Sequence, residues 1–222
     1  QVILDIGCGT GYDARKIIQR YPRARVLGLD IVEAMANRAR RNSGLWRRLT
    51  GRCGFGCGDA ERLPLAPASV DMIVSNLALQ WCDPHTVFAE ARRVLRPGGL
   101  LMFTTFGPDT LRELRDAWRA ADDAPHVHAF IDMHDIGDML IHAGFADPVM
   151  DMEPFTLTYA SVMEVMRDIK QLGAHNVALN RTRGLTGKAR FARFRAAYES
   201  RARNGKIPAT YEAVYGHAWV PE

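Results

Sequence analysis

The stretch Asp5-Ile6-Gly7-Cys8-Gly9-Thr10-Gly11 decides the fold class of this chain. It follows the apolar run Val2 to Ile6, which is typical of a buried parallel strand. It precedes apolar residues at helical spacing, and Pro22 ends that helical pattern. Glycines between a strand and a helix let the backbone approach a ligand where a Cβ atom would clash. The stretch therefore predicts a ligand-binding turn at the start of an α/β domain.

Strand-like and helix-like segments alternate through the first half of the chain. We expect further strands at Val26 to Leu29, Cys53 to Cys57, Val70 to Val74 and Leu100 to Phe106, the last of them completely buried. Helices are expected around Met35 to Arg41 and Val87 to Leu95, the latter ended by Pro97-Gly98-Gly99. This alternation predicts a doubly wound, Rossmann-like parallel sheet. Ligands on such sheets lie beyond the carboxyl ends of the strands, near the point where strand order reverses.

The second half predicts a helical cap inserted between the last strands. We treat residues 1–222 as one domain, with a cofactor-binding core at about 1–106 and the C-terminal strands and cap at about 107–222. Pro154 indicates an edge or bulge position for its strand. The expected elements are helices at Thr110 to Ala121, Met133 to Ala143, Val162 to Leu172 and Lys188 to Arg203, and strands at Pro148 to Tyr159 and Thr210 to Trp219.

Composition excludes several classes of protein. The 222 residues are 47% hydrophobic and 24% charged, with a formal net charge of +4, so neither a disordered nor a collagen-like chain is indicated. Four cysteines in a chain of this length make no disulfide framework. Cys53 and Cys57 lack the second Cys/His pair of a metal site, so we expect no metal. No apolar run approaches the roughly 20 residues of a membrane span, and a cytoplasmic protein is expected. Because Gln1 already lies inside the first strand, we also expect a preceding segment.

The spacing of the glycines distinguishes between two cofactors. A dinucleotide fingerprint places its third glycine three residues after the second, whereas Gly11 follows Gly9 after two. The loop also begins with Asp5, a charge that repels a pyrophosphate and attracts a cationic amino-acid group. We therefore predict that Asp5, Gly7, Gly9 and Gly11 bind S-adenosylmethionine rather than NAD.

Three further strand ends carry residues that suit this cofactor. Asp30, followed by Ile31, ends the second strand at the distance where a carboxylate accepts both ribose hydroxyls. Asp59 and Ala60 end the third strand, where a carboxylate accepts from the adenine amino group. Asn76 and Leu77 end the fourth and are expected near the methionine portion. The alternative is that Asp30 and Asp59 are helix caps or turn residues.

With these residues the first half resembles the class I methyltransferases. The stretch Ser75 to Asp83 is similar to the malonyl-acyl-carrier-protein O-methyltransferases of biotin synthesis (the BioC family) and also to trans-aconitate methyltransferases. Five later segments resemble the BioC family alone and in order: Met166 to Lys170, Gly173-Ala174, Arg183 to Gly187, Pro208 to Glu212 and Val214 to Trp219. The family usually has an N-terminal helical segment, and we expect such a segment to precede Gln1.

The resemblance implies methyl transfer to the free carboxylate of a malonyl thioester. A carboxyl group with a reference pKa of about 4 is already ionised at neutral pH, so no general base and no catalytic triad is expected. Positioning and removal of water remain as the enzyme's tasks. The substrate candidates are Gln80, Trp81, Arg167, Arg183, Tyr215 and His217. Packing is the alternative role for Trp81, structural support for His217 and exposed surface for the two arginines.

A basic stretch between Arg181 and Lys206 contains Glu199 as its single acid. A solvated helix face is one interpretation. The other is that the helix from Lys188 to Arg203 attracts an acidic acyl carrier protein. No nucleic-acid module is recognisable, and Phe191, Phe194 and Tyr198 recur as a core face would. Three rival functions remain. They are methylation of a free small acid such as trans-aconitate, a cofactor-binding assembly factor similar to an arginine hydroxylase, and a generic small-molecule methyltransferase whose basic helix is only exposed surface.

Overall fold

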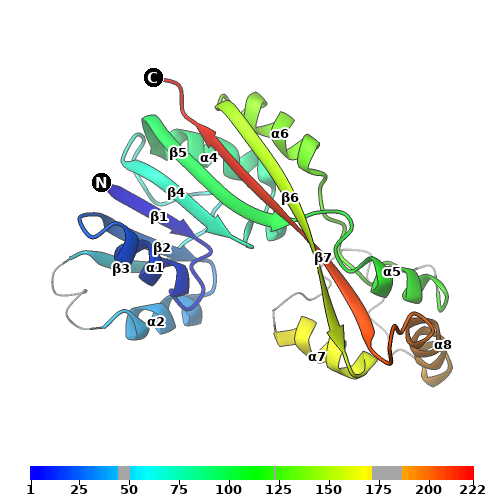
Figure 1. The fold of residues 1–222 in the computed structure, drawn as a ribbon. Helices are drawn as coiled ribbons and strands as arrows, with labels where there is room; N and C mark the ends of the chain where they lie inside the picture. The colour runs from blue at the N-terminus through cyan, green and yellow to red at the C-terminus, as the bar shows by residue number, and fades with distance from the viewer. Residues whose placement is uncertain (45–50, 123, 172–186) are drawn as a thin grey trace. The chain divides into compact units, whose positions relative to one another are not determined.

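The structure is a computed structural model that describes residues 1–44, 51–122, 124–171 and 187–222 (Figure 1). Within these residues a seven-stranded sheet has the order β3-β2-β1-β4-β5-β7-β6. Parallel pairing of β1 with both β2 and β4 makes the strand order reverse at β1, which confirms the predicted doubly wound sheet. The strands are β1 (Val2–Ile6), β2 (Arg25–Asp30), β3 (Cys53–Cys57), β4 (Val70–Asn76), β5 (Leu95–Phe106), β6 (Ala146–Tyr159) and β7 (Ile207–Trp219).

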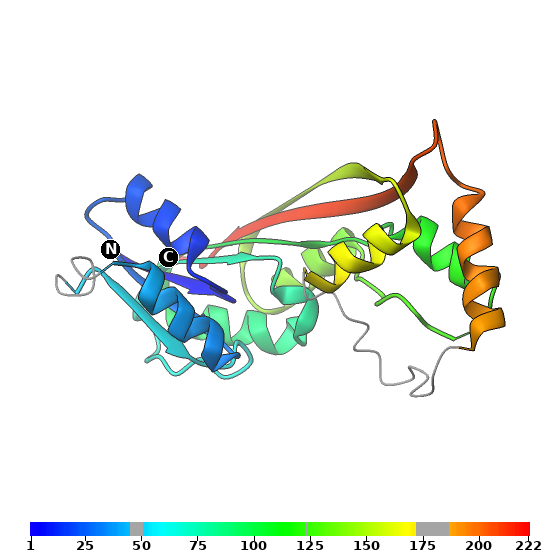
Figure 2. The same ribbon diagram turned by 90° about the horizontal axis from the view of Figure 1, so that it is seen from below.

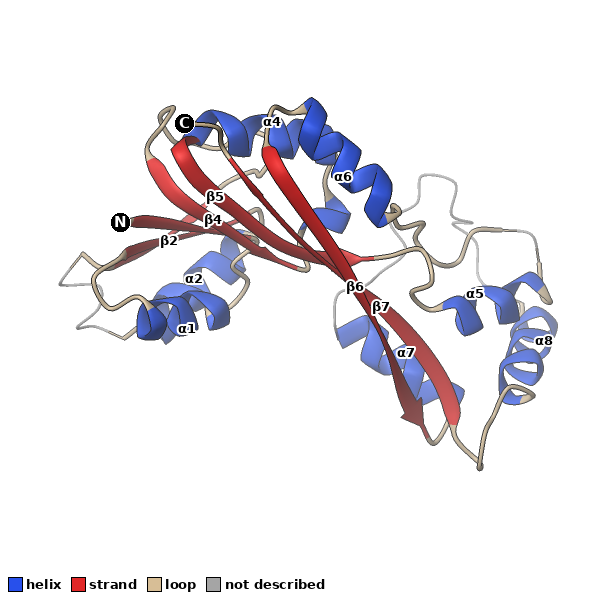
Figure 3. Cartoon of the chain, turned by 45° about the horizontal axis from the view of Figure 1, so that its top comes forward, coloured by secondary structure: helices blue, strands red, loops and turns tan. Residues whose placement is uncertain are grey.

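Helices cover both faces of the sheet around β1 and β4. Figure 3 shows α1 (Tyr12–Arg20) and α2 (Glu33–Asn42) on one face, and α4 (Pro84–Val94) and α6 (Met133–His142) on the other. The short helix η1 (Leu79–Trp81) leads from β4 into α4. This arrangement of layers is the one that right-handed crossovers between parallel strands produce.

The chain divides into two compact units. The first contains residues 1–105, 132–152 and 214–222, and the second contains 106–131 and 153–213. In the second unit α5 (Arg112–Arg119) lies beside α8 (Lys188–Glu199), and α7 (Val162–Gln171) precedes α8 in the chain (Figures 1 and 2). Both α7 and α8 fall between β6 and β7 in the sequence, as predicted for the cap. The description of residues 1–222 as one domain stays a prediction.

Each unit has its own apolar core. In the first, Ile3, Ala14 and Val26 are completely buried and pack against Phe55. In the second, Trp118, Phe194 and Tyr198 pack with Val165. The α8 face bearing the aromatic residues is therefore a core face, as their helical spacing predicted.

The junction between α4 and β5 differs from expectation. The helix α4 ends at Val94, and β5 begins at Leu95 rather than Leu100. Val70 pairs with Leu95 and Met72 with Leu100, so the Pro97-Gly98-Gly99 segment is a bulge within the strand instead of a loop after the helix. The prediction that β5 is completely buried is wrong, because its side chains alternate and Met102 is 40% exposed.

The basic helix α8 ends at Glu199 rather than Arg203. Asn204 and Gly205 have positive φ angles of 50° and 72°, and Arg203 forms a bridge with Lys206. The chain reverses there to enter β7. Helical geometry cannot continue through such a turn.

Candidate cofactor site

The glycine-rich loop is hydrogen-bonded to the end of β2. The backbone N–H groups of Gly7 and Cys8 both donate to the carbonyl oxygen of Leu29, at 2.8 and 3.0 Å. Gly7 has φ +71°, and a Cβ atom there would lie 2.3 Å from the Cβ of Ala78. Gly9 has φ +51°, but a Cβ atom there would meet nothing within 4 Å. Packing thus requires glycine at position 7, whereas position 9 faces open space that a ligand can occupy.

Asp30 connects the loop to the end of β2. Its Oδ2 accepts from the backbone N–H of Gly9 at 2.8 Å, and its Oδ1 accepts from that of Val32 at 2.8 Å. Asp30 is therefore a turn residue, as the alternative interpretation allowed. Each carboxylate oxygen can accept two hydrogen bonds, so both oxygens of Asp30 retain acceptor capacity for a ligand. The neighbouring Ile31 is 69% exposed and offers an apolar surface beside these acceptors.

Asp5 is a buried carboxyl group with an unsatisfied oxygen. Its residue is 1% exposed, and its Oδ2 has no hydrogen-bond partner within the described ranges. Burial, and next the negative charge of Asp13, raise the pKa of Asp5 to about 7. A buried acceptor without a donor costs free energy. A cationic group bound beside Asp5 would supply the missing donor and charge.

The end of β4 is held by two residues that the sequence did not single out. Asn76 donates from Nδ2 to Asp13 Oδ2 at 3.1 Å and accepts at Oδ1 from Thr104 Oγ1 at 2.5 Å. The N–H of Leu77 also donates to Thr104 Oγ1, at 3.1 Å. These bonds hold Leu77 in the left-handed region at φ 52°. The sequence gives a weak signal for Asp13, because it is an acidic residue in the first helical turn after the glycines. It gives no signal for Thr104, whose position depends on the β4–β5 register.

Asp59 lies in a tight turn after β3. Its Oδ1 accepts from the N–H of Glu61 at 2.9 Å, and Asp59 forms a bridge with Arg62. Asp59 is exposed and Ala60 half-buried. The Oδ2 of Asp59 accepts no hydrogen bond from the part of the chain that the structure describes. Asp59 is thus a turn residue with one oxygen left for a ligand.

The parallel register brings these strand ends to one edge of the sheet. Ile6 pairs with Leu29 and with Ser75, and Asp30 pairs with Cys57. Most of the predicted cofactor residues lie at these positions or within two residues of them. Their chemistry fits S-adenosylmethionine: a buried carboxylate for its cation, a second carboxylate for hydroxyls and a third for an amino group.

Gln80 and Trp81, two substrate candidates, lie in η1 directly after this edge. Gln80 donates from Nε2 to the carbonyl of Leu77 at 2.7 Å, and its Oε1 accepts from Thr105 at 3.4 Å. Its amide therefore supports the β4 turn. Trp81 is 39% exposed.

Tyr215 and His217 share one face of β7. The ring of Phe103 fills the space beside Gly216, whereas Val220 exchanges backbone hydrogen bonds with Gly98 and Gly99. The end of β7 beyond His217 therefore runs toward the amino end of β5. Trp219 accordingly lines a cavity with Gln1 and Arg96, at the amino ends of β1 and β5. Of these two aromatic residues of β7, Tyr215 lies nearer the carboxyl ends of the parallel strands, whereas Trp219 lies at their amino ends.

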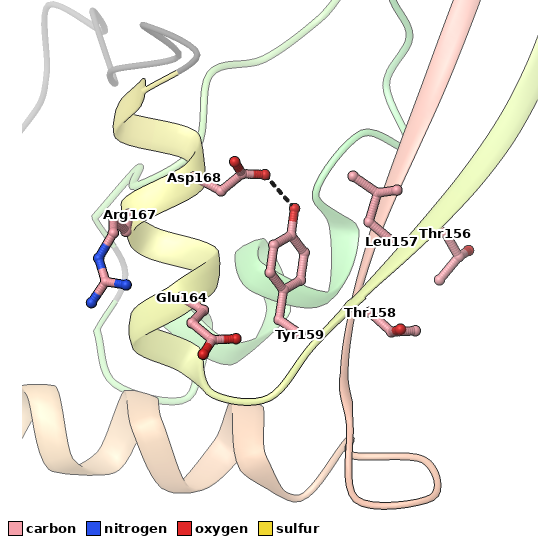
Figure 4. A pocket seen from close by; sticks show the side chains of 7 residues that line it. All are labelled: Thr156, Leu157, Thr158, Tyr159, Glu164, Arg167 and Asp168. Carbon is pink, nitrogen blue, oxygen red and sulfur yellow. Dashed lines mark hydrogen bonds between the residues drawn. The ribbon is translucent and has the colours of Figure 1, made fainter.

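Arg167 borders a groove in the second unit, formed by the end of β6 and by α7 (Figure 4). Tyr159 donates its hydroxyl proton to Asp168 Oδ2 at 2.6 Å across this groove. Burial and the hydrogen bond to Asp168 raise the pKa of Tyr159. Figure 4 shows the side chain of Arg167 pointing away from that pair. Arg183 lies outside the described residues.

Several arginines of the basic stretch have structural roles. Arg190 lies 3.2 Å from Asp122, and Arg193 donates to the carbonyl of Ala121 at 3.0 Å. Arg201 pairs with Asp116 of α5 at 3.2 Å. These contacts attach α8 and its end to α5 and the segment after it. Lys188 and Lys206 are exposed and form no ion pair with described residues.

The described parts of the chain contain no group of three or more His, Cys, Asp or Glu side chains that would hold a metal ion. None of the helices in those parts is long and apolar enough to cross a membrane. Of the four cysteines, Cys8 and Cys53 are buried, Cys82 is half-buried and Cys57 is exposed.

Comparison with known proteins supports the fold and shows the family. Residues 4–103 match the methyltransferase domain family. The chain is 53% identical to a malonyl-[acyl-carrier protein] O-methyltransferase of Gallionella capsiferriformans, over 99% of this chain and 77% of the relative. The protein of the same name from Nitrosospira multiformis is also 53% identical, over 99% of this chain and 76% of the relative. The solved YcgJ protein of Bacillus subtilis is similar in fold, with a TM-score of 0.68 and 19% identity, covering 100% of this chain and 92% of that one.

Proposed function

Because this chain belongs to the malonyl-[acyl-carrier protein] O-methyltransferase family, we propose that it methylates the free carboxylate of a malonyl thioester during synthesis of the biotin precursor. The observation that carries this proposal is 53% identity over 99% of the chain. The expected family, fold class and methyltransferase activity are confirmed. The expected cofactor, S-adenosylmethionine, is confirmed as well.

The residues proposed to hold the cofactor are those at the carboxyl edge of the first unit. S-adenosylmethionine supplies a methyl group on a positively charged sulfonium, which leaves as a neutral thioether. Asp5 would accept from its ammonium group, because this buried oxygen lacks a donor. Asp30 would accept from ribose hydroxyls while holding Gly9, and Asp59 from the adenine amino group.

The chemical demand on the protein is small. A malonyl carboxylate with a reference pKa of about 4 needs no base at neutral pH. The protein instead has to orient this carboxylate and exclude water from it. Gln80 holds the β4 turn through Leu77, and we assign it a positioning role. Tyr215, His217, Trp81, Arg167 and Arg183 remain candidates for contact with the malonyl group.

We further propose that exposed cations around α8 attract the acidic carrier protein. A variant that reverses the charges of Arg190 and Arg193 would test this poorly, because both side chains hold α8 in place. Lys188 and Lys206 are the better choice, since both are exposed. Long-range attraction between opposite charges raises association rates and weakens with salt.

The double variant Lys188→Glu/Lys206→Glu tests this docking. Its KM for malonyl-carrier protein should rise severalfold at low salt, whereas its KM for malonyl-coenzyme A should not change. The matched control Arg38→Glu/Arg41→Glu alters two exposed cations of α2 in the first unit. An equal rise of KM in both double variants, or in neither, would reject α8 as the docking surface.

The function itself is tested by transfer of radiolabel from S-adenosylmethionine. The complete protein is offered malonyl-carrier protein, malonyl-coenzyme A and trans-aconitate side by side. Base-labile label on the malonyl-carrier protein, well above the other two, is expected. Label on trans-aconitate alone would reject the malonyl substrate but keep the methyltransferase activity. Cofactor binding without any label would favour an assembly factor. A cytoplasmic location stays part of the proposal.

A further inference from the structure

A second cavity lies entirely within the second unit, between α5 and the segment 124–130. Its volume is about 410 Å³, which is in the range of small-ligand pockets. Arg115, Arg119 and His126 line it, together with Pro108, Val127 and Phe130. No carboxylate is among the described residues of its lining. The cavity therefore combines cationic groups with an apolar wall.

Stacked rings make one wall of this cavity rigid. Trp118 stacks on His126 with ring centroids 3.8 Å apart and on Phe194 with centroids 3.9 Å apart. His126 is fixed further by a 2.7 Å contact between its Nε2 and Asp122 Oδ1. Phe130 packs edge-on against Phe106 at 5.6 Å. Because these rings are held by the core, the cavity does not depend on a ligand to form.

The two guanidinium groups are available to a ligand. Arg115 and Arg119 are four residues apart on α5, so they lie on one face of that helix. Arg115 donates one hydrogen bond, to the carbonyl of Thr110 at 2.9 Å, out of the five that a guanidinium offers. The side chain of Arg119 is 72% exposed and lies 3.4 Å from Asp116, which also pairs with Arg201. Moving Arg119 to a ligand thus costs little, because exposed pairs are weak and Asp116 keeps a partner.

We infer that this cavity binds the phosphate and adjoining chain of the 4′-phosphopantetheine arm that carries the malonyl thioester, an inference that rests on the proposed function. Two forked guanidinium groups suit a phosphodiester, which they bind with paired, charge-assisted hydrogen bonds. The apolar wall suits the methylated carbon chain next to that phosphate. Both a carrier protein and coenzyme A present this same arm.

The test compares substrates with and without the phosphate. The variants are Arg119→Gln, Arg119→Lys and Arg115→Gln/Arg119→Gln, with Arg112→Gln as a matched control on α5 whose ion pair with Asp109 is exposed and outside the lining. For the double variant we expect KM to rise at least tenfold for malonyl-carrier protein and malonyl-coenzyme A. KM for malonyl-pantetheine, which lacks the phosphate, should stay unchanged. Arg119→Lys should retain more affinity than Arg119→Gln, and Arg112→Gln should behave as wild type.

A binding measurement separates this inference from the proposed reaction. Titration calorimetry with 4′-phosphopantetheine and with pantetheine requires no turnover and no malonyl group. The wild-type protein should bind the phosphorylated probe at least tenfold more tightly, and the double variant should lose that preference. Equal binding of both probes by the wild-type protein, or an equal rise of KM for all three thioesters in the double variant, would overturn the inference even if methyl transfer is observed. Selective phosphate binding without methyl transfer would instead reject the proposed reaction alone.

Discussion

Replacement of Asp5 by asparagine should make the cofactor-free protein more stable and should weaken its binding of the cofactor. Asparagine keeps the size of the side chain but cannot carry a charge. Asp5 is 1% exposed, and burial raises its pKa from 3.8 to about 7. The ionised form is therefore disfavoured in the folded protein unless a cation lies beside it.

The sign and size of the stability effect follow from this shift. Below about pH 4 Asp5 is protonated in both the folded and unfolded states, so it costs nothing. Between pH 4 and 7 the unfolded chain loses the proton first, and folding stability falls. Above pH 7 the cost is constant, at about 4 kcal/mol for roughly three pKa units. Asp5→Asn removes this pH dependence and should raise the free energy of unfolding at pH 8 by up to about 4 kcal/mol.

The effect on binding has the opposite sign. If S-adenosylmethionine requires the ionised carboxylate, wild-type affinity should fall about tenfold from pH 8 to pH 6, because only a tenth of Asp5 is then ionised. Loss of a hydrogen bond to a charged group costs about 1.5–3 kcal/mol, so Asp5→Asn should bind about 10- to 150-fold more weakly at pH 8. Its affinity should not change between pH 6 and pH 8.

Urea unfolding and titration calorimetry at both pH values measure these effects. Calorimetry in two buffers of different ionisation enthalpy also shows proton release by the wild-type protein at pH 6. The control Asp135→Asn makes the same chemical change at an exposed site in the first turn of α6 and should alter neither quantity. If Asp5→Asn is less stable than wild type at pH 8, or binds the cofactor as tightly, the role given to Asp5 is wrong.

Three further predictions concern packing and hydrogen bonds. Gly7→Ala should unfold the first unit or lower its stability by several kcal/mol, because the new Cβ atom would lie 2.3 Å from the Cβ of Ala78. Gly9→Ala should lower the stability by only about 1–2 kcal/mol yet abolish cofactor binding. Denaturation and calorimetry on both variants check this, and equal stabilities of the two variants would contradict it. Arg193→Ala should destabilise the protein by about 1–2 kcal/mol, because it removes the hydrogen bond to Ala121. Arg195→Ala removes only an exposed ion pair and should cost less than about 0.5 kcal/mol. Urea unfolding midpoints measure both effects, and the reverse order would be evidence against the anchoring of α8 by Arg193. Tyr159→Phe should lower stability by about 1–3 kcal/mol because it removes a 2.6 Å hydrogen bond to a carboxylate, and an unchanged melting curve would refute that assignment.

The first half of the fold was predictable because its strands are short and are followed by recognisable turns. Val2 to Ile6 and Cys53 to Cys57 have the expected bounds, and the glycine turn lies where the sequence indicated. The β5 strand was not, because Pro97-Gly98-Gly99 is typical of a loop. Only the pairing of β4 with β5 shows that these residues form a bulge.

For the candidate cofactor residues, position was predictable where a residue lies at the end of a strand, while their roles stay predictions. Asp5, Asp30 and Asn76 follow this rule. The roles of Thr104 and Arg193 depend on partners 28 and 72 residues away, so no local pattern reveals them. A local pattern can also suggest too much. The charge pattern of α8 indicated a docking surface, but two of its arginines, Arg190 and Arg193, have structural partners.

The most direct measurement is the intact mass of malonyl-carrier protein after incubation with the complete protein and S-adenosylmethionine. The account predicts a gain of one methyl group on the malonyl arm, dependent on the cofactor and reversed by mild base, as expected of a methyl ester. Asp5→Asn should slow this gain in proportion to its weaker cofactor binding. An unchanged mass, with the cofactor bound and the protein folded, would contradict the proposed methylation of the malonyl carboxylate.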